Sequence, residues 1–341
     1  PANPLSLHDA LPISITFTGN TLGLNGTFSL APTGPNGHGS IGAFTTTAAL
    51  QVPGGWPIGT TLNWPENSSS AVLNMPAGST VLYAELRWSG NAITQVQDVS
   101  AFINNPIDFT TPAGLSLVAP DPATSSQVVI SDGDTMYFRS QDVTALVIAG
   151  GAGTYTVGAV PGALGFAVNS NPLVALIEET YLGWTLSVVY ANPLLPVRNM
   201  NYWVNDTAVN AAGLPQDIPV SGFTTPPVGP ISGRLLFSSG EGDSFIVGDS
   251  ALFGPNVGTL TNVGNPVTTP NPNPGTSPNN PSNNFFGSQI NGDTGLLDTS
   301  GTFGTSNSDA YIPTSVPAAR QGWDITKDRK STRLNSSHKT H

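Results

Sequence analysis

Thr80-Val-Leu-Tyr-Ala-Glu-Leu-Arg-Trp88 is the stretch that decides the fold. Apolar residues recur along it at every second position, so one face carries Leu82, Ala84, Leu86 and Trp88 while the other carries Tyr83, Glu85 and Arg87. Gly183-Trp-Thr-Leu-Ser-Val-Val-Tyr190 repeats the alternation. A period of two is the pattern of a β-strand with one face in a core. The predicted core comprises Leu82, Leu86, Trp88, Tyr155, Trp184, Leu186, Val188 and Leu235.

Further strands are predicted over residues 127–130, 153–160, 200–204 and 234–237, separated by turn signals such as Asp132-Gly133 and Asn291-Gly292. No stretch of ten residues carries an apolar stripe of period 3.6, and the segment 142–147 is expected to form a single helical turn with Asp142 as its N-cap. Short strands without βαβ spacing predict an all-β chain. We expect a β-sandwich or jelly roll, built as one large domain with long loops.

The composition limits the classes of partner. The 341 residues include 10 Lys and Arg against 21 Asp and Glu, which gives a net charge of −11. A chain so poor in cations neutralises few phosphates, so we expect no nucleic-acid partner and no membrane insertion. With no cysteine, disulfides and thiolate metal sites are excluded.

Both termini resemble translated sequencing adapters. Asp328 to His338 agrees with one adapter without a mismatch, and Leu5 to Ile13 agrees with its partner. We therefore take 1–13 and 328–341 as adapter-derived and 14–327 as native, and expect neither end to pack against the domain. Within 14–327, the Pro/Asn-rich tract 262–284 is either an exposed loop or a linker.

An ordered series of motifs carries a resemblance over nearly all of 14–327. The series includes Gly39-Ser-Ile-Gly-Ala-Phe44, the 82–88 strand, Asp142-Val-Thr144, Gly183 to Pro193, Gly240-Glu-Gly-Asp243, Phe253-Gly-Pro-Asn256, Asn283-Asn-Phe-Phe286 and Gly322-Trp-Asp-Ile325. It resembles the N-terminal β domain of large repeat-containing surface proteins of Gram-positive spore-forming bacteria. The resemblance implies an extracellular location at the cell surface or cell wall and no catalytic residues. It also implies final strands beyond Ile325 that are missing here, which would leave an unpaired sheet edge.

The sequence contains few residues that could be catalytic. His38 is the only histidine outside the adapter segments and lies in a Gly-rich loop, so a nucleophile–histidine constellation has no positioned base. A carboxylate pair for glycoside hydrolysis stays open as a minor alternative, with Glu178, Glu179, Glu241 and Asp243 as the candidates. We expect the chain not to be an enzyme.

Two binding sites are candidates. Glu241, Asp243, Asp249 and Asp293 lie in Gly-rich loops that suit calcium, which prefers carboxylate and carbonyl oxygens. The alternative is that each acid caps its own turn. Trp56 and Trp64 are candidates for an aromatic platform that binds sugar rings, with packing at a strand end as the alternative.

The sequence as a whole favours a non-catalytic structural or adhesive module of a bacterial cell-surface protein. Its expected partners are other surface proteins or cell-surface glycans. The alternative is a glycan-binding jelly-roll module. The two differ in whether exposed Trp residues, with Asn and Asp, line a concave face.

Overall fold

The structure is a computed structural model of the whole chain. The parts that it describes are residues 5–25, 43–45, 60–61, 63–95, 97–130, 133–163, 181–204, 209, 215–221, 233–240, 248–254, 257–266, 280–286, 290–291, 319–320 and 323–331.

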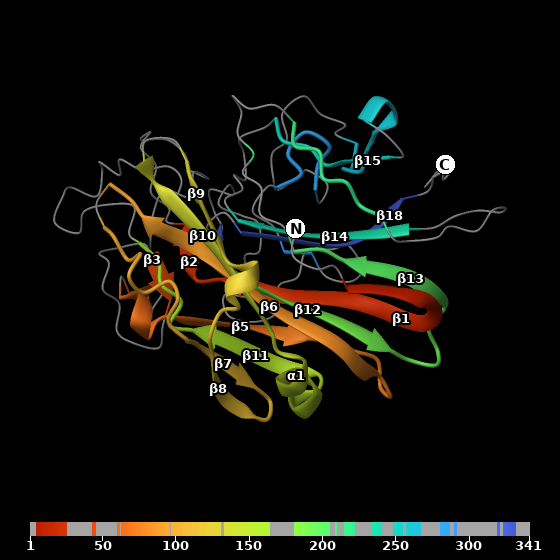
Figure 1. Ribbon diagram of the computed structural model, residues 1–341, viewed down its shortest axis with the longest axis horizontal. Helices are drawn as coiled ribbons and strands as arrows, with labels where there is room; N and C mark the ends of the chain where they lie inside the picture. Colours follow the sequence, from red (N-terminus) through yellow and green to blue (C-terminus); the bar gives the residue numbers. More distant parts are fainter. Residues whose placement is uncertain are drawn as a thin grey trace.

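The chain is mostly β, and its sheets are antiparallel (Figure 1). The strands are β1 (Leu5–Thr21), β2 (Gly23–Asn25), β3 (Ala43–Thr45), β4 (Thr60–Thr61), β5 (Ser68–Leu73), β6 (Thr80–Ile93), β7 (Ile107–Thr111), β8 (Gly114–Val118), β9 (Ser126–Val129), β10 (Thr135–Asp142), β11 (Gly153–Gly158), β12 (Leu182–Ala191), β13 (Val197–Tyr202), β14 (Gly233–Gly240), β15 (Leu252–Phe253), β16 (Thr261–Asn262), β17 (Ala319–Arg320) and β18 (Trp323–Ser331). Within the described ranges the only α-helix is α1 (Thr144–Gly150), and the 3-10 turns are η1 (Trp64–Glu66), η2 (Pro122–Thr124) and η4 (Val257–Thr259). The predicted all-β class is thereby confirmed.

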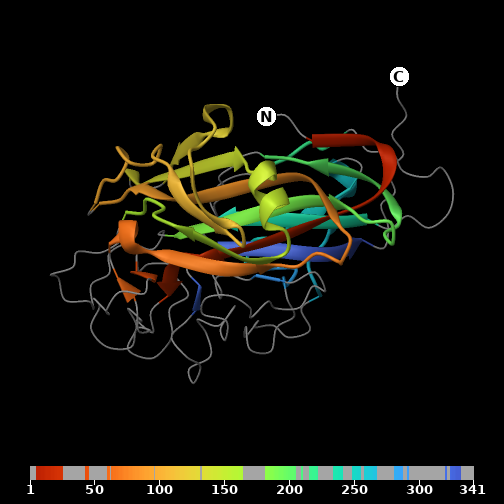
Figure 2. The ribbon, with the colours of Figure 1, turned by 90° about the horizontal axis from the view of Figure 1, so that it is seen from below.

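Two sheets form the body of the molecule. A curled six-stranded sheet has the order β13-β1-β12-β6-β10-β9, and a four-stranded sheet has the order β5-β11-β7-β8 (Figures 1 and 2). Strand β14 pairs with β18, and β17, β2, β3 and β4 form a smaller sheet. The two strands that the sequence identified first, β6 and β12, are neighbours at the centre of the six-stranded sheet.

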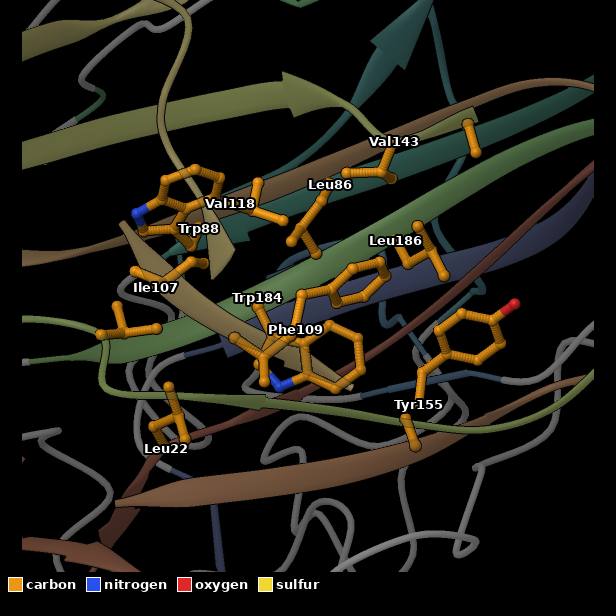
Figure 3. Close-up of a cluster of buried hydrophobic side chains, with 14 of the residues drawn as sticks. Leu22, Leu86, Trp88, Ile107, Phe109, Val118, Val143, Tyr155, Trp184 and Leu186 are labelled. Carbon is orange, nitrogen blue, oxygen red and sulfur yellow. The ribbon is translucent and has the colours of Figure 1, made fainter. Parts of the chain in front are cut away.

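The main core lies between the six-stranded and four-stranded sheets. Trp88 pairs with Trp184 in the β6–β12 register, and both indoles are fully buried. The four-stranded sheet contributes Phe109 and Tyr155 to the same cluster, as Figure 3 shows. Burying each of these large side chains contributes roughly 1.5–3 kcal/mol, so this cluster is the main source of stability.

Hydrogen bonds also join the two sheets. The Thr18 hydroxyl donates to the Val72 carbonyl at 2.8 Å, and the Asn20 amide donates to the Ser70 carbonyl at 2.9 Å. The Trp184 indole N–H donates to the Ser69 hydroxyl at 2.9 Å. Polar atoms that point inward from β1 and β12 are therefore satisfied by β5, which removes the cost of burying them.

The opposite face of the six-stranded sheet is covered as well. A second cluster contains Phe17, Phe138 and Tyr202 from this sheet, with Ile290 and the partly buried Leu236 of β14. The Arg87 guanidinium donates to the Ser238 carbonyl at 2.7 Å, which fixes β14 to β6. Strand β12 is consequently buried on both faces.

Two of the predicted core residues are placed differently. Leu82 is 39% exposed, because the β6–β12 register shifts there: Val189 faces Tyr83, the next residue Tyr190 faces Val81, and Leu82 is left without a partner. Such a bulge reverses which residues face the core, and Val81 packs against it instead. Leu235 is half-buried, whereas the other six predicted residues are fully buried.

The expectation that neither terminal segment packs against the domain is wrong. The segment Leu5–Pro12 forms the first half of β1 and pairs with β13, and Ile13 is fully buried beside β12. At the other end, β18 continues through Asp328 to Ser331, where Arg329 pairs with Leu235 and Lys330 with Arg234. Backbone pairing accepts most side chains, so a segment of arbitrary sequence extends a strand that is already in register.

The two ends of the Pro/Asn-rich tract lie together. The Asn265 N–H donates to the Asn280 carbonyl, and the Ser282 N–H donates to the Asn265 carbonyl, both at 2.8 Å. The tract thus returns to where it leaves, which favours the loop over the linker.

Helix α1 begins close to the predicted turn. The predicted N-cap is off by one residue: Val143 occupies the N-cap position, while the Asp142 carboxylate accepts the Thr144 N–H at 2.8 Å. In the described ranges no helix has the length and apolar character needed to cross a membrane.

The bulge in β6 generates a prediction. Leu86→Ala removes a fully buried side chain and is expected to lower the free energy of unfolding by about 2–5 kcal/mol. Leu82→Ala, in the same strand, is expected to cost less than about 1 kcal/mol because that side chain lies outside the core. Urea unfolding measures both, and equal losses would contradict the register.

Candidate functional site

The structure describes one of the four predicted calcium ligands. Glu241, Asp243 and Asp293 lie outside the described residues, and Asp249 follows β14 in the segment 248–254. The Asp249 Oδ2 accepts the Phe286 N–H at 2.6 Å, and its backbone carbonyl accepts the Phe285 N–H at 3.5 Å. Burial raises the pKa of Asp249, and the N–H of Phe286 partly offsets that rise. The carboxylate therefore accepts an N–H from a segment 37 residues later in the chain, and both the calcium site and the capping of its own turn stay predictions.

Asparagine side chains bond to one another and to the backbone in the segment that contacts Gly248 and Asp249. The Asn280 amide donates to the Phe285 carbonyl at 2.9 Å, and the Asn291 amide donates to the Asn280 side-chain oxygen. The Oδ1 of the Asn291 amide is buried and has no hydrogen-bond partner among the described residues. The same holds for the Oδ1 of Asn283, whose carbonyl accepts the Gly248 N–H.

This arrangement suits a hard cation in its chemistry. A buried carboxylate and amide oxygens are the donor set that calcium prefers. Sequence reasoning placed Asn291 in a turn and overlooked Asn283, because a run of Asn in a Pro/Asn-rich region has the appearance of an ordinary loop. Within the described ranges, no three acidic, His or Cys side chains converge on one point.

Trp64 forms an aromatic pair at one end of the molecule. Its ring lies 5.6 Å from that of Phe102, at an interplanar angle of 48°. Trp64 is half-buried in η1, and Phe102 is 44% exposed. Trp56, the other predicted platform residue, lies outside the described residues. The pair offers one partly exposed aromatic surface, and Phe102 was missed because a lone Phe in a loop carries no pattern.

A buried acid lies on the face of β6 that the sequence assigned to solvent. Glu85 is 3% exposed and accepts a hydrogen bond of 2.5 Å from the Tyr83 hydroxyl. Burial raises the pKa of Glu85 above its ordinary value of 4.5, hydrogen bonds from Ser140 and Tyr83 lower it in part, and the charge of Asp142 raises it further. Burial and the hydrogen bond to Glu85 also raise the pKa of Tyr83.

The Glu85 cluster joins three strands of the six-stranded sheet. Its members come from β6 and β10, and Tyr202 of β13 packs on Tyr83 with ring centroids 5.9 Å apart. Asp142 pairs with Glu85 in the β6–β10 register, but its carboxylate caps α1. Outside the described residues lie all four acids proposed for a hydrolytic pair, Glu178, Glu179, Glu241 and Asp243.

A shallow hollow of about 400 Å³ lies beside the turn that precedes β6. Its lining includes Met75, Pro76, Val81, Ile148 and Ala152. These side chains are apolar, Ser79 and Thr80 add hydroxyl groups to the lining, and none of the lining residues carries a charge.

Comparison with known proteins adds no family. No protein-family model matches the chain, and neither the curated proteins nor the solved structures contain a match to it. Function is therefore argued from the geometry described above.

The Glu85 cluster predicts a pH dependence. An acid whose pKa is raised by folding binds its proton more tightly in the folded state, so its contribution to stability falls as pH rises from 4.5 through the raised pKa. Glu85→Gln removes the titrating carboxyl group and keeps a side-chain oxygen that can accept the hydrogen bond from the Tyr83 hydroxyl. The stability of the variant relative to the wild type is expected to increase from pH 4 to pH 8. A difference that stays constant over this range would show that folding does not raise the pKa of Glu85.

The Asp249 segment predicts a response to calcium. If the cation binds, thermal stability rises by RT ln(1 + [Ca²⁺]/Kd), which is about 1.4 kcal/mol at ten times Kd. The shift is expected to disappear with a chelator and in Asp249→Asn, and to persist in Asp108→Asn, a matched change on β7. A melting temperature unaffected by calcium would exclude the site.

Proposed function

We propose that the chain is a non-catalytic structural or adhesive module of a bacterial cell-surface protein. The two large antiparallel sheets, which share one core, support a β-sandwich with long loops as the finer description of its fold. A jelly-roll order of strands is part of the same proposal. The resemblance to surface proteins of Gram-positive bacteria supports an extracellular location.

The observation that carries the proposal is the direct bracing between the sheets. Three side-chain hydrogen bonds cross from β1 and β12 to β5, and they lie beside the fully buried Trp184. Sheets joined by several bonds around one apolar cluster separate only when all of these contacts are lost together. Since the chain has no cysteine, this bracing supplies the cross-linking that disulfides provide in other secreted domains.

Binding of cell-surface glycans is the second candidate function. The partly exposed Trp64–Phe102 pair favours it, because sugar rings stack on aromatic faces and an edge of this pair is open to solvent. Under this alternative the ligand is a saccharide rather than another surface protein.

Adhesion under flow tests the two functions against each other. Beads that carry the protein are expected to bind Gram-positive cell-wall fragments and surface proteins, and Phe102→Ala is expected to leave binding unchanged. A loss of about tenfold or more in Phe102→Ala, with competition by free saccharide, would favour glycan binding. Ile148→Ala, which also truncates an exposed apolar residue, is the matched control. Release of soluble sugars from the fragments by the wild type would contradict a non-catalytic role.

A further inference from the structure

Strand β8 ends the four-stranded sheet with an open edge. It pairs with β7 on one side, and within the described ranges no strand pairs with its other side. An edge of this kind presents a row of free N–H and C=O groups, which is a template for another strand.

The alternation of hydrogen-bonded and non-hydrogen-bonded pairs in the β7–β8 hairpin shows which residues of β8 have their backbone N–H and C=O groups at the open edge. A two-residue turn, Pro112-Ala113, joins Thr111 to Gly114, and such turns close on a hydrogen-bonded pair. Because bonded and non-bonded pairs alternate, Ser116 bonds to Phe109, whereas Leu115 and Leu117 direct their backbone groups to the open edge. Their side chains are 63% and 70% exposed.

The other sheet edges near the core are protected. Strand β5 is covered by β1, whose Thr18 and Asn20 side chains bond to its carbonyls. Strand β9 is short, and the Arg139 guanidinium donates to the carbonyl of Ser126 at 2.7 Å. Strand β13 carries Arg198. Charges, short strands and covering segments are how proteins prevent edge pairing, and β8 has no charged residue, proline or bulge.

The sequence of β8 fits its own copy. Leu115-Ser116-Leu117 reads the same in both directions, so two antiparallel copies centred on Ser116 place each Leu115 opposite Leu117 of the second copy. The outward backbone N–H and C=O groups of Leu115 in each copy then hydrogen-bond to those of Leu117 in the other copy. The exposed leucine side chains form two apolar pairs on one face of the joined sheet. A two-fold axis through Ser116 makes this contact closed and self-complementary. In a chain of net charge −11, an uncharged edge is also where two copies meet with the least repulsion.

We propose that β8 is a self-association edge through which two copies of this chain join their four-stranded sheets into one sheet of eight strands. The contact is short, so it forms where copies are concentrated, as on a surface that carries many of them. That biological role rests on the proposed function, whereas the pairing itself is a property of the isolated chain.

The test uses the full chain in solution. Sedimentation equilibrium from about 1 µM to about 1 mM is expected to show a monomer–dimer equilibrium for the wild type. Leu117→Lys brings a charge to the edge and is expected to weaken dimerisation about tenfold or more. Leu194→Lys, at an 89% exposed turn residue, is expected to leave it unchanged. Unaltered melting curves confirm that both variants are folded.

Cross-linking tests the register. The chain has no cysteine, so Ser116→Cys introduces a single thiol that lies opposite its own copy. This variant is expected to form a disulfide-linked dimer much faster than Thr154→Cys, which places an exposed thiol on the inner strand β11 of the same sheet. A wild type that stays monomeric at 1 mM, a dimer that survives Leu117→Lys, or equal cross-linking of the two cysteine variants would each overturn the proposal. None of these results depends on adhesion to cell walls.

Discussion

The pairing of β6 with β12 is the contact on which the rest of the structure depends. It sets Trp88 opposite Trp184, and the four-stranded sheet packs onto these two indoles. The reverse face of the same two strands carries Glu85, Arg87 and Thr185, and Ser238 of β14 bonds to both Arg87 and Thr185. A central strand pair with both faces buried has to satisfy polar groups inside the protein. The short bond between Tyr83 and Glu85 and the bond from Arg87 to Ser238 meet that requirement in part, whereas the buried indole N–H of Trp88 has no hydrogen-bond partner among the described residues.

The sequence was sufficient to predict the central strands and most of the core. Alternation located β6, β11 and β12, and six of the eight predicted core residues are fully buried. Leu82 was misplaced because a bulge is a property of the pair of strands and leaves no mark on either strand alone. Glu85 looked like a solvent-facing residue because its neighbours include Ser140 of β10 and Tyr202 of β13, which lie far from it in the sequence. Strand β1 was missed in the terminal segment, since its pairing with β13 depends on backbone groups rather than on side-chain pattern.

Fewer of the candidate site residues could be predicted from the sequence. Carboxylates in Gly-rich loops indicated Asp249, but the amide oxygens of Asn283 and Asn291 become informative only once their donors are known. The partner of Trp64 is Phe102, some forty residues away, and only the fold brings the two rings together. The open edge at β8 was equally hidden, because whether a strand is central or terminal is decided by the other strands of its sheet.

Hydrogen exchange of the backbone amides tests the central claim most directly. Strand β12 is covered on both faces and paired on both sides, so its amides are expected to exchange only through global unfolding, with the free energy measured by urea denaturation. The outward amides of Leu115 and Leu117 are expected to exchange orders of magnitude faster under conditions where the chain is monomeric. Amides of β12 that exchange through local opening, at rates close to those of β8, would contradict the account.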